Sequence, residues 1–218
     1  MVLIDAAQIV GWVDLKLDEL GADMVAFGGH KGLQAPWGIG GLYVAASTKL
    51  KCATAACSIP NRNVGADRNV GATAQPWGSR PGYCDVGSVD QFSLAGLEAS
   101  LKRLSDTTRL HDLEVAREQV SRLRKTLAHN QRVTLYGMVE DNRRLPTIAF
   151  SVDGETSGQS AKRLRKIGLI VGSGLQCSSV SHEAMGTSET GLVRISVGVQ
   201  QSESEIALAD DRLRQLEG

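Results

Sequence analysis

The residue of this chain with the greatest chemical potential is a lysine in a glycine-rich setting. Lys31 follows His30 after a short apolar run, and the glycine-rich stretch 36–41 comes soon after it. Upstream, another apolar run ends in Asp5, and Gln8 follows shortly afterwards. A lysine amine can bind an aldehyde covalently, and a carboxylate can keep a pyridine nitrogen protonated. The pattern therefore predicts a site for pyridoxal phosphate, held covalently on Lys31.

The composition is that of a globular protein without a strongly charged surface. The chain has 218 residues, of which 42% are hydrophobic, with 24 Lys and Arg against 24 Asp and Glu. This balance argues against a broad surface for nucleic acid or anionic membrane. No apolar run approaches the roughly 20 residues of a membrane helix, and the N-terminus lacks the pattern of a signal peptide. We therefore expect a cytoplasmic protein that binds neither nucleic acid nor membrane.

The cysteines do not suggest a metal site. The chain has Cys52, Cys57, Cys84 and Cys177, without a C-x-x-C pair and without a histidine near the first two. We expect no bound metal, and free thiols such as a reducing cytoplasm maintains.

The elements that would position these residues fall into two groups. The first part reads as closely spaced α/β units, and the last third as a compact α+β unit. Apolar runs predict strands at 2–5, 24–27, 40–44, 133–136, 147–152, 169–171 and 193–197. Helical spacing predicts a turn at 15–20 and helices at 90–104, 110–127, 158–167 and from 202 onward. Residues 51–89 break every periodicity, which is typical of a functional or mobile segment.

Four segments in register resemble one protein family. Residues 5–8 match a D-x-x-Q segment, and 27–40 match x-G-H-K-x-x-x-x-P-x-G-x-G. Residues 174–177 match a G-x-x-C loop that His182 and Gly186-Thr187 follow, and 191–196 match G-x-V-R-x-S. Together they resemble the class V aminotransferase superfamily, and within it the cysteine desulfurase and selenocysteine lyase group.

The resemblance implies a role for each matching residue toward pyridoxal phosphate. Lys31 would bind its aldehyde and move protons during the reaction. Asp5 would pair with the pyridinium nitrogen, Gln8 would hydrogen-bond the phenolic oxygen, and His30 would help to hold the phosphate. Ser88 lies in the segment that corresponds to the family's G-T-x-N turn and is a further cofactor-binding candidate.

Two further residues would act on the substrate. By the resemblance, Arg194 would bind the carboxylate of a cysteine-like amino acid, a task that suits its planar, two-pronged donor group. Cys177 would be the thiolate that takes the sulfur and carries it as a persulfide. Each residue also has a structural alternative: a surface lysine, a strand-end cap for Asp5, an ion pair for Arg194, or a small buried thiol for Cys177.

The implied fold is α/β, a partial PLP-dependent transferase fold of type I. We expect a truncated large domain with a mostly parallel sheet at 1–105 and a small α+β domain at 106–218. The family's early part of the large domain, with its phosphate-binding turn and helix, has no counterpart here. Two family positions also differ: Gly28 replaces a Ser or Thr, and Asp90 replaces an Asn near the phosphate. The strand at 2–5 would become an open edge, which favours a homo-oligomer.

Three functions remain open at this point. The first is a cysteine desulfurase that releases sulfur from L-cysteine and passes it to an acceptor protein. The second is a non-catalytic remnant of the family that acts by oligomerising. The third is a class V aminotransferase or other lyase without desulfurase activity, for which a thiol at Cys177 is not needed.

Overall fold

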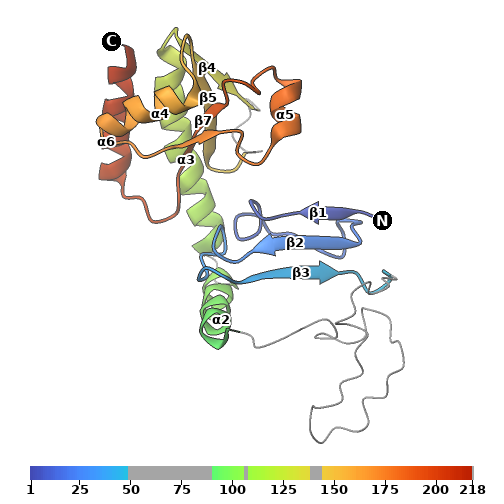
Figure 1. Ribbon diagram of the computed structural model, residues 1–218. Helices are drawn as coiled ribbons and strands as arrows, with labels where there is room; N and C mark the ends of the chain where they lie inside the picture. The colour runs from blue at the N-terminus through green and yellow to red at the C-terminus, as the bar shows by residue number, and fades with distance from the viewer. Residues whose placement is uncertain (49–89, 106–107, 138–143, 218) are drawn as a thin grey trace, which may run out of the picture. The chain divides into compact units, whose positions relative to one another are not determined.

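The chain folds as two compact units, residues 1–106 and 107–218 (Figure 1). The computed structural model describes residues 1–48, 90–105, 108–137 and 144–217. The segment 51–89, expected to be irregular, lies outside the described residues, as does Ser88. Each unit is built around its own sheet.

The first unit contains a three-stranded sheet that brings the lysine segment next to Asp5. Its strands are β1 (Leu3–Asp5), β2 (Met24–Gly28) and β3 (Gly40–Val44), in the order β1-β2-β3. All three predicted strands are confirmed to within a residue. β1 pairs with β2 in parallel and β2 with β3 antiparallel. The expectation of a mostly parallel sheet therefore holds for the first pairing only, and the described sheet is mixed.

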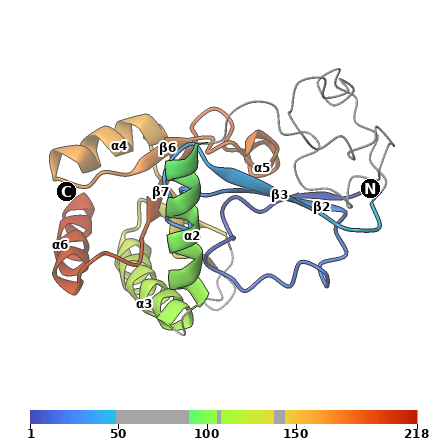
Figure 2. The same cartoon turned by 90° about the horizontal axis from the view of Figure 1, so that it is seen from below.

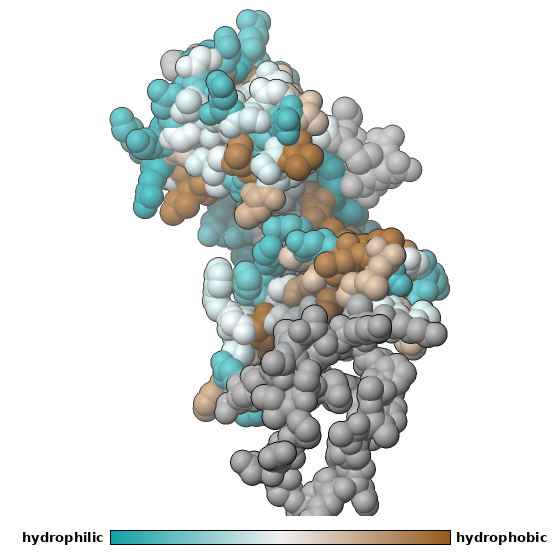
Figure 3. Space-filling model, turned by 45° about the vertical axis from the view of Figure 1, so that its right-hand side comes forward, coloured by the Kyte–Doolittle hydropathy of each residue, from teal (hydrophilic) through white to brown (hydrophobic). Residues whose placement is uncertain are grey.

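The described residues cover one face of this sheet. Residues 6–22 fold back over the face of Val25, where Ala6, Ala22 and Val25 form a small core. The predicted helical turn at 15–20 is a single hydrogen-bonded turn, in which the amides of Glu19 and Leu20 donate to Lys16. Apolar side chains elsewhere on this unit are exposed, including Leu3 at 58% and Leu42 at 49%. Figure 3 shows apolar side chains gathered on the surface of this unit.

Helix α2 (Gln91–Ser105) completes the described part of the first unit, close to the predicted helix 90–104. Its apolar side chains are only partly buried, since Leu104 is buried while Leu94 and Leu101 are 45% and 49% exposed. The helix nevertheless has a fixed start, because the side chain of Asp90 caps its first turn.

The second unit is a four-stranded antiparallel sheet with helices on one face (Figure 1). Its strands are β4 (Val133–Tyr136), β5 (Thr147–Val152), β6 (Gly172–Gly174) and β7 (Leu192–Ser196), in the order β4-β5-β7-β6. Helices α3 (Thr108–His129) and α4 (Ser157–Lys166) pack on the sheet, and α6 (Glu203–Arg214) packs beside α3 (Figure 2). Alternate residues of β5 face these helices, and Ile148, Phe150 and Val152 are buried there.

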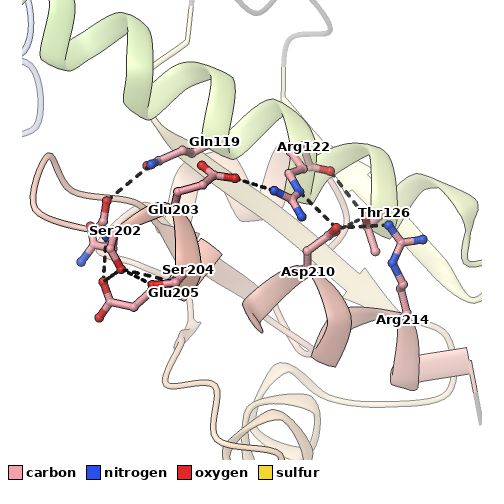
Figure 4. A network of polar contacts seen from close by, with 10 residues as sticks. Gln119, Arg122, Thr126, Ser202, Glu203, Ser204, Glu205, Asp210 and Arg214 are labelled. Atoms are coloured by element: carbon pink, nitrogen blue, oxygen red, sulfur yellow. Dashed lines mark hydrogen bonds and ion pairs between the residues drawn. The ribbon is translucent and has the colours of Figure 1, made fainter. Parts of the chain in front are cut away.

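A buried carboxylate joins α3 to α6 (Figure 4). The side chain of Asp210 is 4% exposed and accepts hydrogen bonds from the Thr126 hydroxyl, from Arg122 Nε at 3.2 Å and from Arg214 Nη2 at 3.1 Å. Arg122 also reaches Glu203 through Nη1 at 2.6 Å. Because a buried charge is costly unless it is paired, this network fixes how the two helices pack.

Two predictions for the second unit need correction. The strand expected at 169–171 lies at Gly172–Gly174, directly after the apolar residues that suggested it. The short helix α5 (Ser179–Ala184) was not predicted, because six residues carry no helical periodicity. The closing helix begins as predicted, with Ser202 as N-cap and Glu205 completing a capping box. None of the described helices is long and apolar enough to cross a membrane.

Candidate functional site

The loop that carries Lys31 is closed by hydrogen bonds and tight glycine contacts. Gly29 N–H donates to Ile39 O at 2.8 Å, and Ala35 N–H donates back to Gly29 O at 2.9 Å. A β-carbon at Gly29 would approach Ile39 Cγ2 to 2.8 Å, and one at Gly32 would approach Val10 O to 2.5 Å. Glycine is therefore required near Lys31 on both sides. The loop is anchored while the lysine itself is exposed.

The Lys31 amine is available for reaction. In the part of the chain that the structure describes, no hydrogen bond or ion pair engages its side chain. An ordinary surface lysine would also have an exposed amine without a partner. The assignment of Lys31 as a functional residue therefore depends on the residues around it.

Asp5 and Gln8 lie at the same edge of the sheet as the loop after β2. Asp5 ends β1, which runs parallel to β2 with Asp5 opposite Ala26. Because the carboxyl ends of parallel strands meet at one edge of a sheet, the turn at 5–8 and the loop at 29–32 leave the sheet together. Asp5 Oδ1 accepts the Ala7 N–H at 2.9 Å. One carboxylate oxygen of Asp5 therefore caps the end of the strand, as the alternative role of this residue predicts. The side chain of Gln8 is exposed.

His30 is held by an aromatic stack. Its imidazole lies on the indole of Trp37, with ring centroids 4.2 Å apart and planes inclined by 15°. A β-carbon at Gly28 would lie 3.5 Å from His30 Cε1, which is an ordinary contact distance. The imidazole therefore sits next to both residues, and the Ser or Thr of the family would have room at position 28.

Helix α2 holds the far half of this loop. A β-carbon at Gly96 would come within 2.4 Å of Pro36 Cγ, so the helix approaches the loop closely there. The Ser93 hydroxyl lies 3.3 Å from Trp37 O, and Arg103 Nη2 donates to Gln34 Oε1 at 3.0 Å. These contacts fix the backbone that positions the stack on His30.

The departure at Asp90 has a structural explanation. Its carboxylate accepts the Ser93 hydroxyl at 2.6 Å and the N–H groups of Phe92 at 3.0 Å and Ser93 at 3.2 Å. The Ser93 hydroxyl, followed by the backbone donors, lowers the pKa of Asp90 below its ordinary value. Asp90 thus occupies two N–H donors in the first turn of α2, and a bound anion would have to use these same donors.

The residues of the first unit fit most of a pyridoxal phosphate molecule. An amine, a carboxylate and an amide suit its aldehyde, ring nitrogen and phenolic oxygen, and Lys31, Asp5 and Gln8 supply them. For the phosphate, the resemblance supplies His30 as the candidate donor among the described residues. The described residues hold no group of three or more His, Cys, Asp or Glu that could bind a metal.

Arg194 is in the second unit, on β7. Its Nε atom is buried and has no hydrogen-bond partner among the described residues. The alternative role in a structural ion pair finds no support there, because no described carboxylate pairs with it. A buried unpaired N–H is costly, which makes a ligand acceptor at this position favourable.

Cys177 is exposed at the tip of the turn between β6 and α5. The alternative of a small buried thiol is therefore wrong. Gln176 and Cys177 both have left-handed backbone angles, with φ of 51° and 60°. Such a pair is uncommon outside glycine and tends to occur at functional sites. The end of the turn is anchored by buried His182, whose Nδ1 lies 2.8 Å from Thr187 Oγ1.

Sequence reasoning missed two residues that the structure places beside predicted ones. Trp37 stacks on His30, and the Gln176 amide lies beside Gly172, the residue paired with Arg194. The only sequence signal for Trp37 was an aromatic residue between Pro36 and Gly38, and for Gln176 there was none.

Comparison with known proteins links the chain to one family. The family model described as Aminotransferase class-V matches residues 1–208. A probable cysteine desulfurase of Methanothermobacter thermautotrophicus is 25% identical over 218 residues, which cover 99% of this chain and 53% of that protein. The cysteine desulfurase IscS of Edwardsiella ictaluri is 28% identical over 222 residues, covering 97% and 48%. The chain spans about half the length of these relatives.

Solved structures agree in fold. The apo cysteine desulfurase of Thermococcus onnurineus NA1 has a TM-score of 0.76 at 23% identity, with 98% of this chain and 52% of that one covered. The cysteine desulfurase CsdA of Escherichia coli has a TM-score of 0.76 at 21% identity, with 99% and 51% covered. At these identities the likeness shows the fold, and the predicted partial α/β fold is confirmed.

Proposed function

Because this chain belongs to the aminotransferase class-V family, we propose that it is a pyridoxal-phosphate-dependent cysteine desulfurase, taking sulfur from L-cysteine as a persulfide on Cys177. The observation that carries the proposal is the exposed Cys177 thiol on a left-handed turn. A transaminase has no use for a thiol presented in this way. The names of the relatives support the same substrate.

The first unit would hold the cofactor. Pyridoxal phosphate supplies an aldehyde and an electron sink. Lys31 would bind the aldehyde through its free amine, and Asp5 would keep the ring nitrogen protonated with the carboxylate oxygen that Ala7 does not occupy. Gln8 would donate to the phenolic oxygen, and His30, steadied by Trp37, would donate to the phosphate. Ser88, which lies outside the described residues, is proposed as a further phosphate contact.

The second unit would handle the substrate. Arg194 would bind the carboxylate of L-cysteine with a guanidinium whose Nε is otherwise unpaired. The Cys177 thiolate would attack the substrate sulfur, so that a sulfur–sulfur bond forms while the carbon–sulfur bond breaks. Lys31 would return the proton to the carbon, and alanine would leave. The exposed turn leaves the persulfide open to an acceptor protein.

The test has two stages. Pyridoxal phosphate added to the full chain should give the visible absorbance of protein-bound cofactor at about 420 nm, and Lys31→Ala should abolish it. With L-cysteine, persulfide and alanine should then form, and Cys177→Ala should abolish both while it keeps the absorbance. Absence of this absorbance band would support the alternative of a non-catalytic remnant of the family. Turnover of amino acids that persists in Cys177→Ala would support an aminotransferase.

We also propose that the chain forms a homo-oligomer. β1 lies at the edge of the sheet that the described residues form, and Val2, Leu3 and Leu42 are about half exposed on the first unit. Exposed apolar side chains next to an open edge favour association of chains. Size-exclusion chromatography with light scattering should give a mass above 23.2 kDa, and a stable monomer at high concentration would contradict the proposal.

A further inference from the structure

One row of residues crosses the whole sheet of the second unit. The pairing of strands places Tyr136 opposite Ala149, Ala149 opposite Arg194, and Arg194 opposite Gly172. Residues paired across antiparallel strands share a face of the sheet. Ile148 and Phe150 occupy the other face, against the helices. Arg194 therefore projects from the face opposite to α3 and α4, with the small residues Ala149 and Gly172 on its two sides.

The side chain of Gln176 folds back onto this row. A β-carbon at Gly172 would lie 3.3 Å from both Nε2 and Oε1 of Gln176, and 3.7 Å from Cβ of Arg194. The amide and the base of the Arg194 side chain thus lie around the same point. A side chain at position 172 would occupy the space that the amide takes. The left-handed backbone of Gln176 is part of the turn that makes this return possible.

The two polar side chains on this face, Arg194 and Gln176, have donors without partners among the described residues. Arg194 Nε is buried and unpaired among the described residues, and no hydrogen bond there engages the Gln176 amide. A guanidinium and a carboxamide N–H both donate, and a carboxylate can accept from both at once. A carboxylate ligand would therefore satisfy the two groups together and balance the charge of the guanidinium, whereas a cation would be repelled by it.

We propose that Gln176 is a second recognition residue for the substrate carboxylate, beside Arg194. The inference rests on the proposed function and adds to it: the turn that presents the Cys177 thiol also supplies a hydrogen-bond donor for the substrate carboxylate. The ligand class is an α-amino acid whose carboxylate is held by Arg194 and Gln176 while its side chain is directed to Cys177.

The test compares two alkylating reagents on the full chain without cofactor. Iodoacetate carries a carboxylate, iodoacetamide does not, and the same thiolate attacks both. Their rate ratio at Cys177, measured by peptide mass spectrometry, therefore reports carboxylate recognition independently of the thiol's ionisation. The ratio should exceed that of free glutathione. Gln176→Ala should lower it about tenfold, the lower end of what is expected for the loss of one hydrogen bond to a charged group.

Two variants sharpen the result. Gly172→Ala keeps a backbone that alanine can adopt but fills the space of the amide, so it should lower the ratio as Gln176→Ala does. Gln176→Glu is nearly the same shape and should lower the ratio further by repulsion, which preserves the test if Gly172→Ala unfolds. Gly158→Ala is the matched control, because no atom lies within 4 Å of its new β-carbon.

The proposal would be overturned if Gln176→Ala and Gln176→Glu kept the wild-type ratio while Arg194→Lys lowered it, because Arg194 would then act alone. A wild-type ratio equal to that of glutathione would also overturn it. Neither outcome depends on pyridoxal phosphate. Failure of the proposed function would instead appear as a missing visible band, with the ratios unaffected.

Discussion

The imidazole of His30 lies against the indole of Trp37, with ring centroids 4.2 Å apart and planes 15° from parallel. Such a stack contributes about 1 kcal/mol beyond the area it buries. It also limits the orientations of His30, since Trp37 is attached to α2 through its carbonyl oxygen and the Ser93 hydroxyl. None of the described residues restrains the neighbouring Lys31 side chain by a hydrogen bond or ion pair.

Replacing Trp37 with Ala should release His30. We expect the His30 Cε1–H resonance to move downfield, because the indole no longer shields it, and cofactor affinity to fall about fivefold for a loss of about 1 kcal/mol. Proton NMR of the chain without cofactor measures the first effect, and titration with pyridoxal phosphate measures the second. Trp37→Phe, which keeps an aromatic ring at this position, is the control. A His30 resonance that does not move in Trp37→Ala would show that the two rings are not stacked in solution.

Asp90 should act through its position as a helix cap rather than through its charge alone. Asn is as good an N-cap as Asp, whereas Ala offers no acceptor. We therefore expect Asp90→Ala to expose the first-turn amides of α2, and Asp90→Asn to keep them protected, as measured by hydrogen exchange at residues 91–94. Equal loss of protection in both variants would mean that the charge, not the cap geometry, holds the turn.

Gly96 should resist the substitution that usually stabilises a helix. Gly→Ala inside a helix commonly adds up to about 1 kcal/mol, but a β-carbon here would stand 2.4 Å from Pro36 Cγ. We expect Gly96→Ala to destabilise the first unit and to detach the loop, visible as a change in Trp fluorescence. Gly158→Ala in α4 should be neutral or stabilising, because the added β-carbon would meet nothing within 4 Å beyond the local helix backbone. A stabilised Gly96→Ala would contradict the close approach.

The sequence was sufficient for elements whose signals are local. The strands at 40–44, 133–136 and 147–152 have the predicted bounds, because alternating or continuous apolar runs end there at turn residues. The last helix begins at Ser202 as predicted, and its start is fixed by reciprocal hydrogen bonds between Ser202 and Glu205, only three residues apart. Local chemistry decides these features, so a single sequence contains them.

Features that depend on packing were not accessible in this way. The apolar residues 169–171 predicted a strand, yet Gly172–Gly174 pairs with β7. Tertiary packing decides that 172–174 forms the strand, because Gly172 lies next to the Gln176 amide and Gly174 lies against Gly191. Likewise, the resemblance supplied His30, Lys31 and their neighbours as candidates, but the stack on His30 depends on how a loop is held by a helix distant in sequence.

The Asp210 network should make the second unit sensitive to acid. Burial alone would raise the pKa of Asp210, but hydrogen bonds from Thr126, Arg214 and Arg122 outweigh it, so the pKa lies below its ordinary value. A carboxyl with a lowered pKa stabilises the folded state above its unfolded pKa of about 4, and this contribution is lost as the pH falls through the folded pKa.

Replacing Asp210 with Asn should therefore remove both the stability and its pH dependence. We expect a loss of about 2 kcal/mol at neutral pH, mainly from hydrogen bonds to the carboxylate, because both arginines are largely exposed and screened. Urea unfolding followed by circular dichroism near pH 7 and below pH 4 measures it, while Trp fluorescence follows the first unit separately. Asp211→Asn, an exposed neighbour, is the control. If wild type and Asp210→Asn lost equal stability on acidification, Asp210 would not be the acid-sensitive group.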